Sequence, residues 1–507
     1  MKQVYGIDLG TTNSCIAVIG EDGQPEVIKN LEDHYTTPSV IFYDENGDPV
    51  VGGEAKSMMG SDIKRTVAFI KREMSNKNYH QDIEGVNESV TPITASALIL
   101  KKVVDDANEQ RSYEGLPPIH KAVITVPAYF GNDERKRTEQ AAEIAGLEVL
   151  GLLNEPTAAA LSYGTKGLNN KTFMIYDLGG GTFDVSIMRM QNGELETLAS
   201  DGNHHLGGKD WDTALIDIAL QKEGLGVTYD DIKDSKEVGK MLIAAENCKK
   251  NLSKADKAAF KFMYQRKMHF IEISRSMFEE ITEELVDLTI NIVEKAKKLA
   301  LERTDSLNIT DIILVGGSSY MPMIKKRLMD EYPNCNIRLD NLEPDRAVAK
   351  GAAIHAASLE GEKAPVKLGD DLATRSYGFR CNVEGGAVMV SNVVKRTDPI
   401  VFNDSHSFYT AADDQTGVSL GLYENISPDD YVDLEKCKLI EEAPLEWGFP
   451  VPADTEVVAY VMRDANGIVN IKVECQGKTR NFVIKGEGTL SDAEIEAERR
   501  RLANKHV

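Results

Sequence analysis

The chain has 507 residues, of which 42% are hydrophobic and 27% charged, a composition typical of a globular chain with roughly three domains. Its formal net charge of −23 argues against a broad surface for nucleic acid or an anionic membrane, because both partners attract positive charge. No apolar run approaches the roughly 20 residues that span a bilayer, and the N-terminus lacks a secretory-signal pattern. The 6 cysteines show no Cys-x-x-Cys spacing, so we expect reduced thiols and a cytoplasmic location.

A glycine-containing turn near the N-terminus separates two short apolar runs. The runs are residues 4–7 and 15–18, and the turn reads Asp8-Leu9-Gly10-Thr11-Thr12-Asn13-Ser14. This order predicts a strand, a tight turn and a second strand. Glycine lets the backbone approach an anion, the hydroxyls add donors, and Asp can hold a metal and its waters.

Up to about Ser358, short apolar strands alternate with helices, which predicts an α/β fold. Residues 122–126 form an expected strand, and residues 132–146 an expected helix that ends in glycine. A second glycine-rich turn, residues 177–184, again lies between apolar runs. Two such turns can hold one polyphosphate from both sides, which predicts two similar halves around one nucleotide. For either turn alone, a hairpin without a ligand is the alternative.

Two further elements complete the α/β region. Apolar residues spaced by three and four from Phe278 to Leu299 predict one long helix with a single core-facing side. A strand over residues 312–315 leads into Gly316-Gly317-Ser318-Ser319, and a helix opens at Met321. This strand-to-helix loop is a further candidate for a phosphate or ribose contact.

The pattern changes after residues 361–365. From Arg375 to Ile484, short alternating segments separated by Asp, Asn and Gly turns predict an all-β module. A helix then begins near Ser491, where Ser491 and Glu494 form a capping-box pattern.

Seven segments carry a resemblance to the seventy-kilodalton heat-shock chaperones, the DnaK family. They occur in the family's order over about the first 357 residues: DLGTTNSC, TVPAYF, NEPTAAALSYG, DLGGGTFDVS, HLGGKDWD, LVGGSS and AVAKGAAIHAA. More weakly, FYTAADDQTGVSL, RDANGIVNIKV and LSDAEIEAERRRL resemble the family's β-sandwich and the opening of its lid helix.

The resemblance implies the fold and its divisions. An α/β actin-like, two-lobed ATPase domain with duplicated RNase H-like halves is expected over residues 1–358. A linker (359–374), an all-β sandwich that binds peptides (375–489) and the start of a truncated lid helix (490–507) follow.

The resemblance also implies the activity. It predicts an ATP-dependent chaperone of the stress response that binds exposed hydrophobic segments of unfolded or extended polypeptides. It predicts a weak ATPase that converts ATP to ADP and phosphate, with Mg²⁺ and K⁺ as ions. A J-domain co-chaperone and a nucleotide-exchange factor are the implied partners; neither nucleic acid nor a membrane is expected.

Site residues follow by matching the family's motifs position by position. The catalytic positions are Lys71, Glu155, Asp184 and Thr182, with Lys71 reaching the γ-phosphate and the attacking water; a solvated surface charge is the alternative for Lys71. Asp8 and Asp177 are expected to hold Mg²⁺ mainly through water. The nucleotide-binding positions are Thr11, Thr12, Asn13, Gly179, Gly180, Gly181, Gly208, Glu246, Lys249, Lys250, Ser253, Gly316, Gly317, Tyr320 and Asp345.

Two further sets concern coupling and peptide binding. Pro127 matches the family's proline switch and Arg135 the arginine that senses domain docking, while a rigid strand end is the alternative for Pro127. Sandwich core is the alternative to a peptide groove for Phe408, Val418 and Leu420. The full set of groove candidates is Phe379, Phe408, Ala411, Val418 and Leu420.

The sequence departs from the family pattern in several places. Tyr320 replaces an arginine that stacks on adenine, and a phenol ring can also stack. Residues 369–375 lack the apolar run of the usual linker, and the loop at residues 381–386 is longer than usual. Without the rest of a helical lid, we expect fast peptide release.

Two other classes of function compete with the chaperone. One is a nucleotide-switched scaffold or regulator whose β domain binds one dedicated protein. The other is a small-molecule kinase of the wider actin and sugar-kinase fold, which would need a sugar cleft and would not carry a β-sandwich.

Overall fold

A computed structural model gives the structure of the chain. It describes residues 4–86, 89–163, 168–339, 343–361, 367–368, 372, 375–383, 385–399, 401–463, 469–483, 489–503 and 505. Most of the expected linker, the Gly164 that ends NEPTAAALSYG, and Asn466 and Gly467 of RDANGIVNIKV lie outside the described residues.

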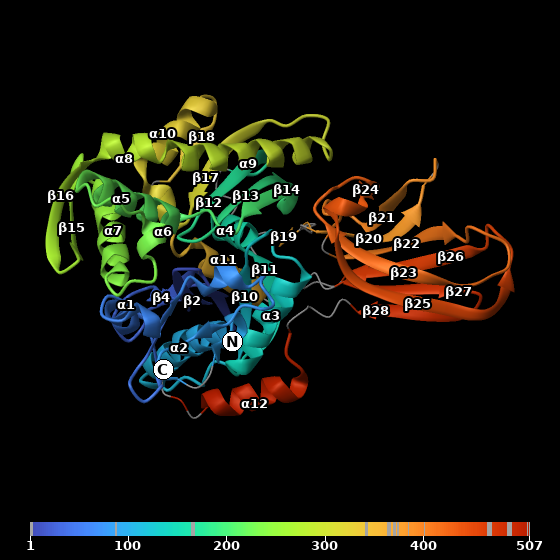
Figure 1. Cartoon of the computed structure of the whole chain (residues 1–507), viewed down its shortest axis with the longest axis horizontal. Helices are drawn as coiled ribbons and strands as arrows, with labels where there is room; N and C mark the ends of the chain where they lie inside the picture. The colour runs from blue at the N-terminus through green and yellow to red at the C-terminus, as the bar shows by residue number, and fades with distance from the viewer. Residues whose placement is uncertain are drawn as a thin grey trace. The chain divides into compact units, whose positions relative to one another are not determined.

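The chain divides into two compact units, which are described separately (Figure 1). The first unit comprises Met1–Pro127, Arg137–Lys367 and Leu490–Val507, and the second comprises Ala128–Lys136 and Leu368–Thr489.

The first turn lies in a mixed sheet of the first unit. Its hairpin strands run antiparallel, and the first of them also pairs in parallel with the strand that contains Thr125. The sheet order is β11 (Glu148–Asn154), β10 (Lys121–Val126), β1 (Tyr5–Asp8), β2 (Asn13–Ile19) and β3 (Pro25–Ile28), with β4 (Thr37–Pro38) paired to β2.

The second turn lies in a sheet with the same local plan. Its hairpin is again antiparallel, and the first strand again has a parallel neighbour. The order is β18 (Asn336–Arg338), β17 (Ile309–Val315), β12 (Lys171–Leu178), β13 (Phe183–Gln191), β14 (Glu194–Asn203) and β19 (Lys367–Leu368). The expected pair of similar halves, each with one phosphate turn, is therefore present.

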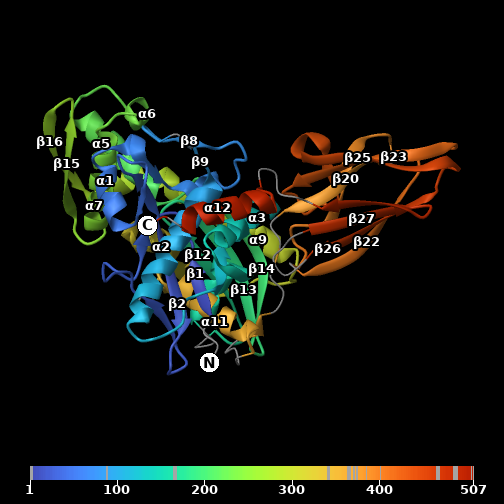
Figure 2. The ribbon, with the colours of Figure 1, turned by 90° about the horizontal axis from the view of Figure 1, so that it is seen from below.

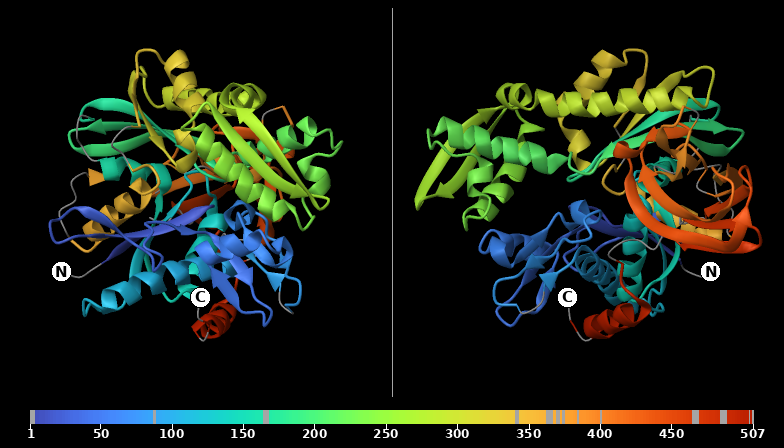
Figure 3. Two further views of the ribbon diagram at one scale, coloured as in Figure 1. Left: turned by 90° about the vertical axis from the view of Figure 1, so that its left-hand side faces the viewer. Right: turned by 45° about the vertical axis from the view of Figure 1, so that its right-hand side comes forward.

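Helices cover both sheets of the first unit. The largest core contains the fully buried Trp211 and joins the second sheet to the helices after it. The hairpin of β15 and β16 packs beside α7 (Figure 3). The helices and the smaller strands are α1 (Gly53–Met59), α2 (Pro92–Ser112), α3 (Asn132–Ile144), α4 (Glu155–Tyr163), α5 (Gly208–Lys222), α6 (Tyr229–Ile232), α7 (Val238–Leu252), α8 (Arg275–Ile281), α9 (Glu283–Leu301), α10 (Pro322–Glu331), α11 (Ala347–Leu359), the 3₁₀ turns η1 (Ile63–Arg65), η2 (Ile70–Glu73) and η3 (Gly317–Tyr320), and the strands β5 (Val40–Tyr43), β6 (Pro49–Val51), β7 (Thr66–Ala68), β8 (Gln81–Asp82), β9 (Ser89–Val90), β15 (Lys257–Tyr264) and β16 (Lys267–Ser274).

The expected single helix from Phe278 to Leu299 is wrong, because the chain breaks it at Thr282. The Thr282 hydroxyl and its backbone N–H both donate to the carbonyl of Phe278, at 2.7 and 3.1 Å, which closes α8 before α9 begins. The apolar residues also do not all face the core, since Ile281 and Leu288 are exposed.

The second unit is a β-sandwich, as expected. Alternate residues of its two sheets meet in one core, in which Phe379, Trp447 and Phe482 are buried. One sheet has the order β24 (Tyr431–Asp433), β21 (Val388–Val394), β20 (Ser376–Asn382), β23 (Gln415–Asn425) and β25 (Lys438–Val451), with η4 at Leu434–Lys436. The other has the order β22 (Phe402–Tyr409), β26 (Glu456–Arg463), β27 (Val469–Cys475) and β28 (Lys478–Val483).

The last helix, α12 (Asp492–Ala503), packs on the part of α3 that follows Lys136 and belongs to the first unit (Figure 2). The Gln140 side chain accepts from the Leu490 N–H at 2.9 Å and donates to the Leu490 carbonyl at 2.7 Å. Ile495 and Leu502, one heptad apart, are buried. The predicted capping box is confirmed: the Ser491 N–H donates to Glu494 Oε2 at 2.7 Å, and the Glu494 N–H donates to Ser491 Oγ at 3.4 Å.

Within the described part of the chain, no helix is long and apolar enough to cross a membrane.

Candidate functional site

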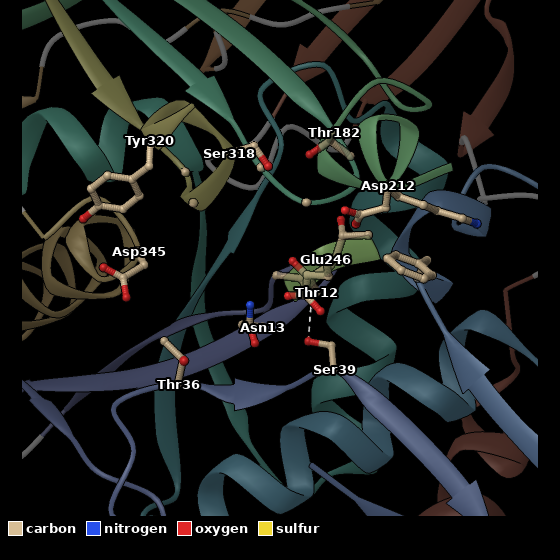
Figure 4. A pocket seen from close by; sticks show the side chains of 18 of the residues that line it. Thr12, Asn13, Thr36, Ser39, Thr182, Asp212, Glu246, Ser318, Tyr320 and Asp345 are labelled. Carbon is tan, nitrogen blue, oxygen red and sulfur yellow. Dashed lines mark hydrogen bonds between the residues drawn. The ribbon is translucent and has the colours of Figure 1, made fainter. Parts of the chain in front are cut away.

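A cavity of about 650 Å³ in the first unit collects most of the predicted nucleotide residues (Figure 4). Both phosphate turns, the loop after β17 and helix α7 contribute to its wall. The predicted residues that line it are Asp8, Thr11, Thr12, Asn13, Lys71, Glu155, Asp177, Gly179, Gly180, Thr182, Glu246, Lys249, Lys250, Ser253, Gly316, Gly317, Tyr320 and Asp345.

The two phosphate turns lie directly against each other. A Cβ added to Gly180 would lie 2.3 Å from Thr12 Oγ1, and one added to Gly181 would lie 2.2 Å from Thr11 Cγ2. Both distances are far below any ordinary contact, so only glycine allows this approach. The turns thus form one cradle built from two distant parts of the sequence.

Each turn is also fixed internally. In the first, the Gly10 N–H donates to Ser14 Oγ at 3.2 Å, and Ser39 Oγ donates to the Gly10 carbonyl at 2.8 Å. In the second, the Gly179 N–H donates to the Thr182 carbonyl at 3.0 Å. These bonds hold the loops in place without a ligand.

Lys71 reaches the cradle from η2 as a buried cation. Its ammonium group forms an ion pair with Glu155, at the start of α4, and donates to the Leu9 carbonyl at 2.6 Å. Only 5% of its side-chain surface is exposed, which rejects the alternative of a solvated surface charge. Its place beside the first turn suits a group that meets a phosphate.

Asp8 is the last residue of β1 and Asp177 the last but one of the equivalent strand β12, and both face the same cavity. Burial raises the pKa of both carboxyls above the ordinary range, and the charge of nearby Glu155 raises each further, while Lys71 opposes the shift. Crowded carboxylates of this kind fit a divalent cation, which would relieve their repulsion. Among the described residues, no three His, Cys, Asp or Glu side chains converge into a ready set of metal ligands.

Arg72, which the sequence reasoning missed, ties the second turn to its surroundings. Its Nε donates to the Gly181 carbonyl at 2.6 Å, and its guanidinium group pairs with Asp210 at 2.7 Å. The only local signals are its place beside Lys71 and that of Asp210 in the motif HLGGKDWD.

Helix α7 supplies the charged wall opposite Tyr320. Burial would raise the pKa of Glu246, but Lys56, at 2.6 Å, and Lys250, at 2.7 Å, lower it to about 2. Lys249 pairs with the buried Asp212 at 2.8 Å and donates to the Gly208 carbonyl at 2.7 Å. A row of fixed charges therefore faces the cavity.

Tyr320 and Asp345 lie on one side of the cavity in Figure 4, with Glu246 and Asp212 on the other. The Tyr320 side chain is 47% exposed, so its ring is open to a ligand. A planar base between this ring and α7 fits the expected adenine position.

Three predicted residues lie behind the wall of the cavity. Asp184 is buried on β13, directly across the hairpin from Asp177. Gly181 and Gly208 back the second turn: the Gly208 N–H donates to the Gly179 carbonyl at 3.0 Å. These residues support the cradle and are not among those that line it.

The two coupling candidates belong to different units. Pro127 is buried directly after β10. Arg135 is buried on α3, where its Nε donates to the Phe130 carbonyl at 3.1 Å.

Four of the five groove candidates belong to the sandwich core or its margin. Phe379 and Leu420 are buried, whereas Phe408 and Val418 are partly buried against the same cluster. The rings of Phe379 and Phe408 meet edge to face with centroids 6.0 Å apart. Ala411 is exposed in the turn after β22. Phe379 and Leu420 are therefore core residues. Phe408, Val418 and Ala411 remain candidates for a peptide groove.

Comparison with known proteins gives a consistent result. The family model described as Hsp70 protein matches residues 4–506. Chaperone protein DnaK of Thermosipho africanus (strain TCF52B) is 37% identical over 512 residues, which cover 97% of this chain and 82% of that protein. Chaperone protein DnaK of Halobacterium salinarum (strain ATCC 29341 / DSM 671 / R1) is 35% identical over 508 residues, 98% of this chain and 77% of that protein.

Proposed function

This chain belongs to the Hsp70 family and is an ATP-dependent molecular chaperone with ATPase activity, and from that premise we propose which residues carry its cycle. The first unit binds ATP and ADP in the cavity between the two phosphate turns. The second unit binds extended hydrophobic segments of polypeptide clients. The family assignment leaves the dedicated scaffold and the sugar kinase without support.

The mutual fit of the two phosphate turns carries the proposal for the first unit. The backbone N–H groups of both turns, with the Thr hydroxyls, bind the polyphosphate from two sides, and the close contact of the turns on one cavity wall supports this. Glu246, Lys250 and Tyr320 then receive the nucleoside.

Positioning and fixed charge perform the hydrolysis. Lys71 donates a hydrogen bond to the terminal phosphate and stabilises the negative charge that develops on it. Glu155 orients Lys71 and accepts a proton from the attacking water. Asp184, across the hairpin from Asp177, supports this arrangement from behind.

Mg²⁺, held by Asp8 and Asp177 mainly through water, would neutralise phosphate charge. The support is the pair of buried carboxyls with raised pKa values on equivalent strands. We extend the proposal to K⁺ on the resemblance alone.

Client binding is assigned to the margin of the sandwich core. Phe408, Val418 and Ala411 offer apolar surface beside the buried Phe379 and Leu420. An extended segment fits such a rim through backbone hydrogen bonds and side-chain pockets.

We further propose coupling through Pro127 and Arg135, a J-domain co-chaperone, a nucleotide-exchange factor and a cytoplasmic location, all on family grounds.

Single-turnover ATP hydrolysis by the purified chain tests the assignment. It is measured with and without an excess of an apolar heptapeptide, and with Asp8→Asn as the control. We expect peptide to accelerate hydrolysis and the substitution to abolish it. Hydrolysis that ignores peptide would contradict coupled action, and hydrolysis unaffected by Asp8→Asn would contradict the assigned site.

A further inference from the structure

The cations on the wall of the nucleotide cavity differ in whether they form a direct ion pair with a carboxylate. Lys56, Lys71, Lys249 and Lys250 each form an ion pair with an acid. Of the remaining two, Lys254 is exposed to solvent. Lys209 is then the one partly buried cation of this wall for which the described residues supply neither an ion pair nor a side-chain hydrogen bond.

Lys209 is held at the start of α5, beside the second phosphate turn. Its backbone N–H donates to the Gly180 carbonyl at 2.8 Å. Its ammonium group lies 4.6 Å from the centre of the Phe69 ring, and Phe69 has a left-handed backbone with φ of 59°. Burial and the charge of Arg72 lower the pKa of Lys209, and the charges of Asp210 and Glu73, neither of which forms an ion pair with it, oppose this shift only in part. A positive charge in this setting is stabilised by any anion that reaches it.

A second cavity, of about 660 Å³, adjoins the nucleotide cavity at Lys209. The described residues common to both walls are Met59, Ala68, Phe69, Lys209 and Leu242, and Lys209 is the only charged one among them. Elsewhere the second cavity has exposed residues of both signs: Lys64, Lys233, Asp82, Glu84 and Asp234. The shared wall therefore presents one ammonium group among apolar side chains.

We propose that the ammonium group of Lys209 binds the terminal phosphate of ATP and, after hydrolysis, the inorganic phosphate formed from it. The inference rests on the proposed nucleotide site, in which Lys71 and the two turns already surround the phosphates. Lys209 adds an unpaired donor beside the second turn, where the terminal phosphate, absent from ADP, carries its charge. Lys209 also lines the second cavity. Inorganic phosphate can therefore approach Lys209 through that cavity when ADP occupies the nucleotide cavity.

The test compares ligands that differ only in the terminal phosphate. Dissociation constants for ATP, for ADP and for inorganic phosphate added to the ADP complex are measured by calorimetry. The proteins are the wild type, Lys209→Met, Lys209→Arg and the control Lys254→Met, which removes an exposed lysine from the same cavity. We expect Lys209→Met to weaken ATP and phosphate binding about tenfold, with ADP binding changed less than about twofold.

Lys209→Arg keeps the charge and should restore most of the selectivity for ATP over ADP, whereas Lys254→Met should leave the ATP-to-ADP affinity ratio at the wild-type value. Equal weakening of ATP and ADP by Lys209→Met, or no weakening of either, would overturn the inference. If Lys209→Met does not fold, Lys209→Gln is measured in its place. Failure of the wild type to bind ATP at all would instead reject the proposed nucleotide site.

Discussion

Lys71 and Glu155 form a buried ion pair that joins η2 to the start of α4, with 5% and 9% of their side-chain surfaces exposed. The pair keeps a cation ready beside the first phosphate turn and fixes the position of the acid next to it. Since each charge is buried, loss of either partner leaves the other uncompensated.

We predict that Lys71→Met slows single-turnover ATP hydrolysis about 100-fold, because it removes the donor expected at the terminal phosphate. ATP affinity should change less than about tenfold, since the backbone of both turns still binds the phosphates. Acid-quench kinetics and calorimetry separate the two effects. Glu155→Gln, which keeps a hydrogen-bond acceptor for Lys71, should also slow hydrolysis. An unchanged rate in both variants would exclude them from the chemistry.

Gly180→Ala should lower the free energy of unfolding of the nucleotide-free protein by about 1–3 kcal/mol. The added Cβ would lie 2.3 Å from Thr12 Oγ1, so the turns must move apart. Gly317→Ala is the matched control on the same cavity wall, because its Cβ meets no atom within 4 Å. Urea unfolding should show a change below about 1 kcal/mol for the control. Equal effects of the two substitutions would contradict the tight fit of the turns.

Asp212 should make the protein less stable as the pH rises through the mildly acidic range. Burial raises its pKa to about 6 in spite of Lys249, and an unfolded carboxyl titrates near about 4. Between these values the folded chain holds the proton more tightly, so this group lowers the free energy of unfolding from about pH 4 to about pH 6. In urea unfolding over this range, the stability of the wild type relative to Asp212→Asn should fall with increasing pH.

The control for the pH experiment is Asp230→Asn, which alters a carboxylate with 82% of its side chain exposed. This variant keeps Asp212, so its free energy of unfolding should still fall from about pH 4 to about pH 6, as in the wild type. A wild-type advantage over Asp212→Asn that grows with pH would show that the sign of the prediction is wrong.

Phe408→Ala and Phe379→Ala distinguish the groove from the core. Phe379 is buried, so its truncation should lower the stability of the sandwich by about 3–5 kcal/mol. Phe408 is only partly buried, so Phe408→Ala should lower the stability less. It should, however, weaken the binding of a fluorescent apolar peptide several-fold. Tyr409→Ala, at an exposed neighbour on β22, is the control. If Phe408→Ala bound the peptide with wild-type affinity, Phe408 would contribute to packing and not to the peptide groove.

The features predicted best are those encoded locally. The two hairpins follow from apolar runs around glycine-rich turns, and the cap of α12 follows from Ser491 and Glu494. The break at Thr282 escaped prediction because the apolar spacing continues through it, and only the observed bond to Phe278 reveals the stop.

Contacts between distant segments were the least predictable. Arg72 and Asp210 form an ion pair although they are 138 residues apart in the sequence. Neither their residue types nor their spacing predicts this contact. Lys209 is likewise an ordinary lysine in sequence, and its significance comes from its place on a wall that two cavities share and from the lack of an ion pair among the described residues. The capping box predicted that α12 forms, yet its packing on α3 depends on Gln140 and a buried apolar stripe.

The contact between Leu490 and Gln140 gives the sandwich the topology of an inserted domain. The chain leaves the first unit after Lys367 and rejoins it at Leu490, where α12 is anchored. The segment between Lys367 and Leu490 therefore has both of its ends in the first unit.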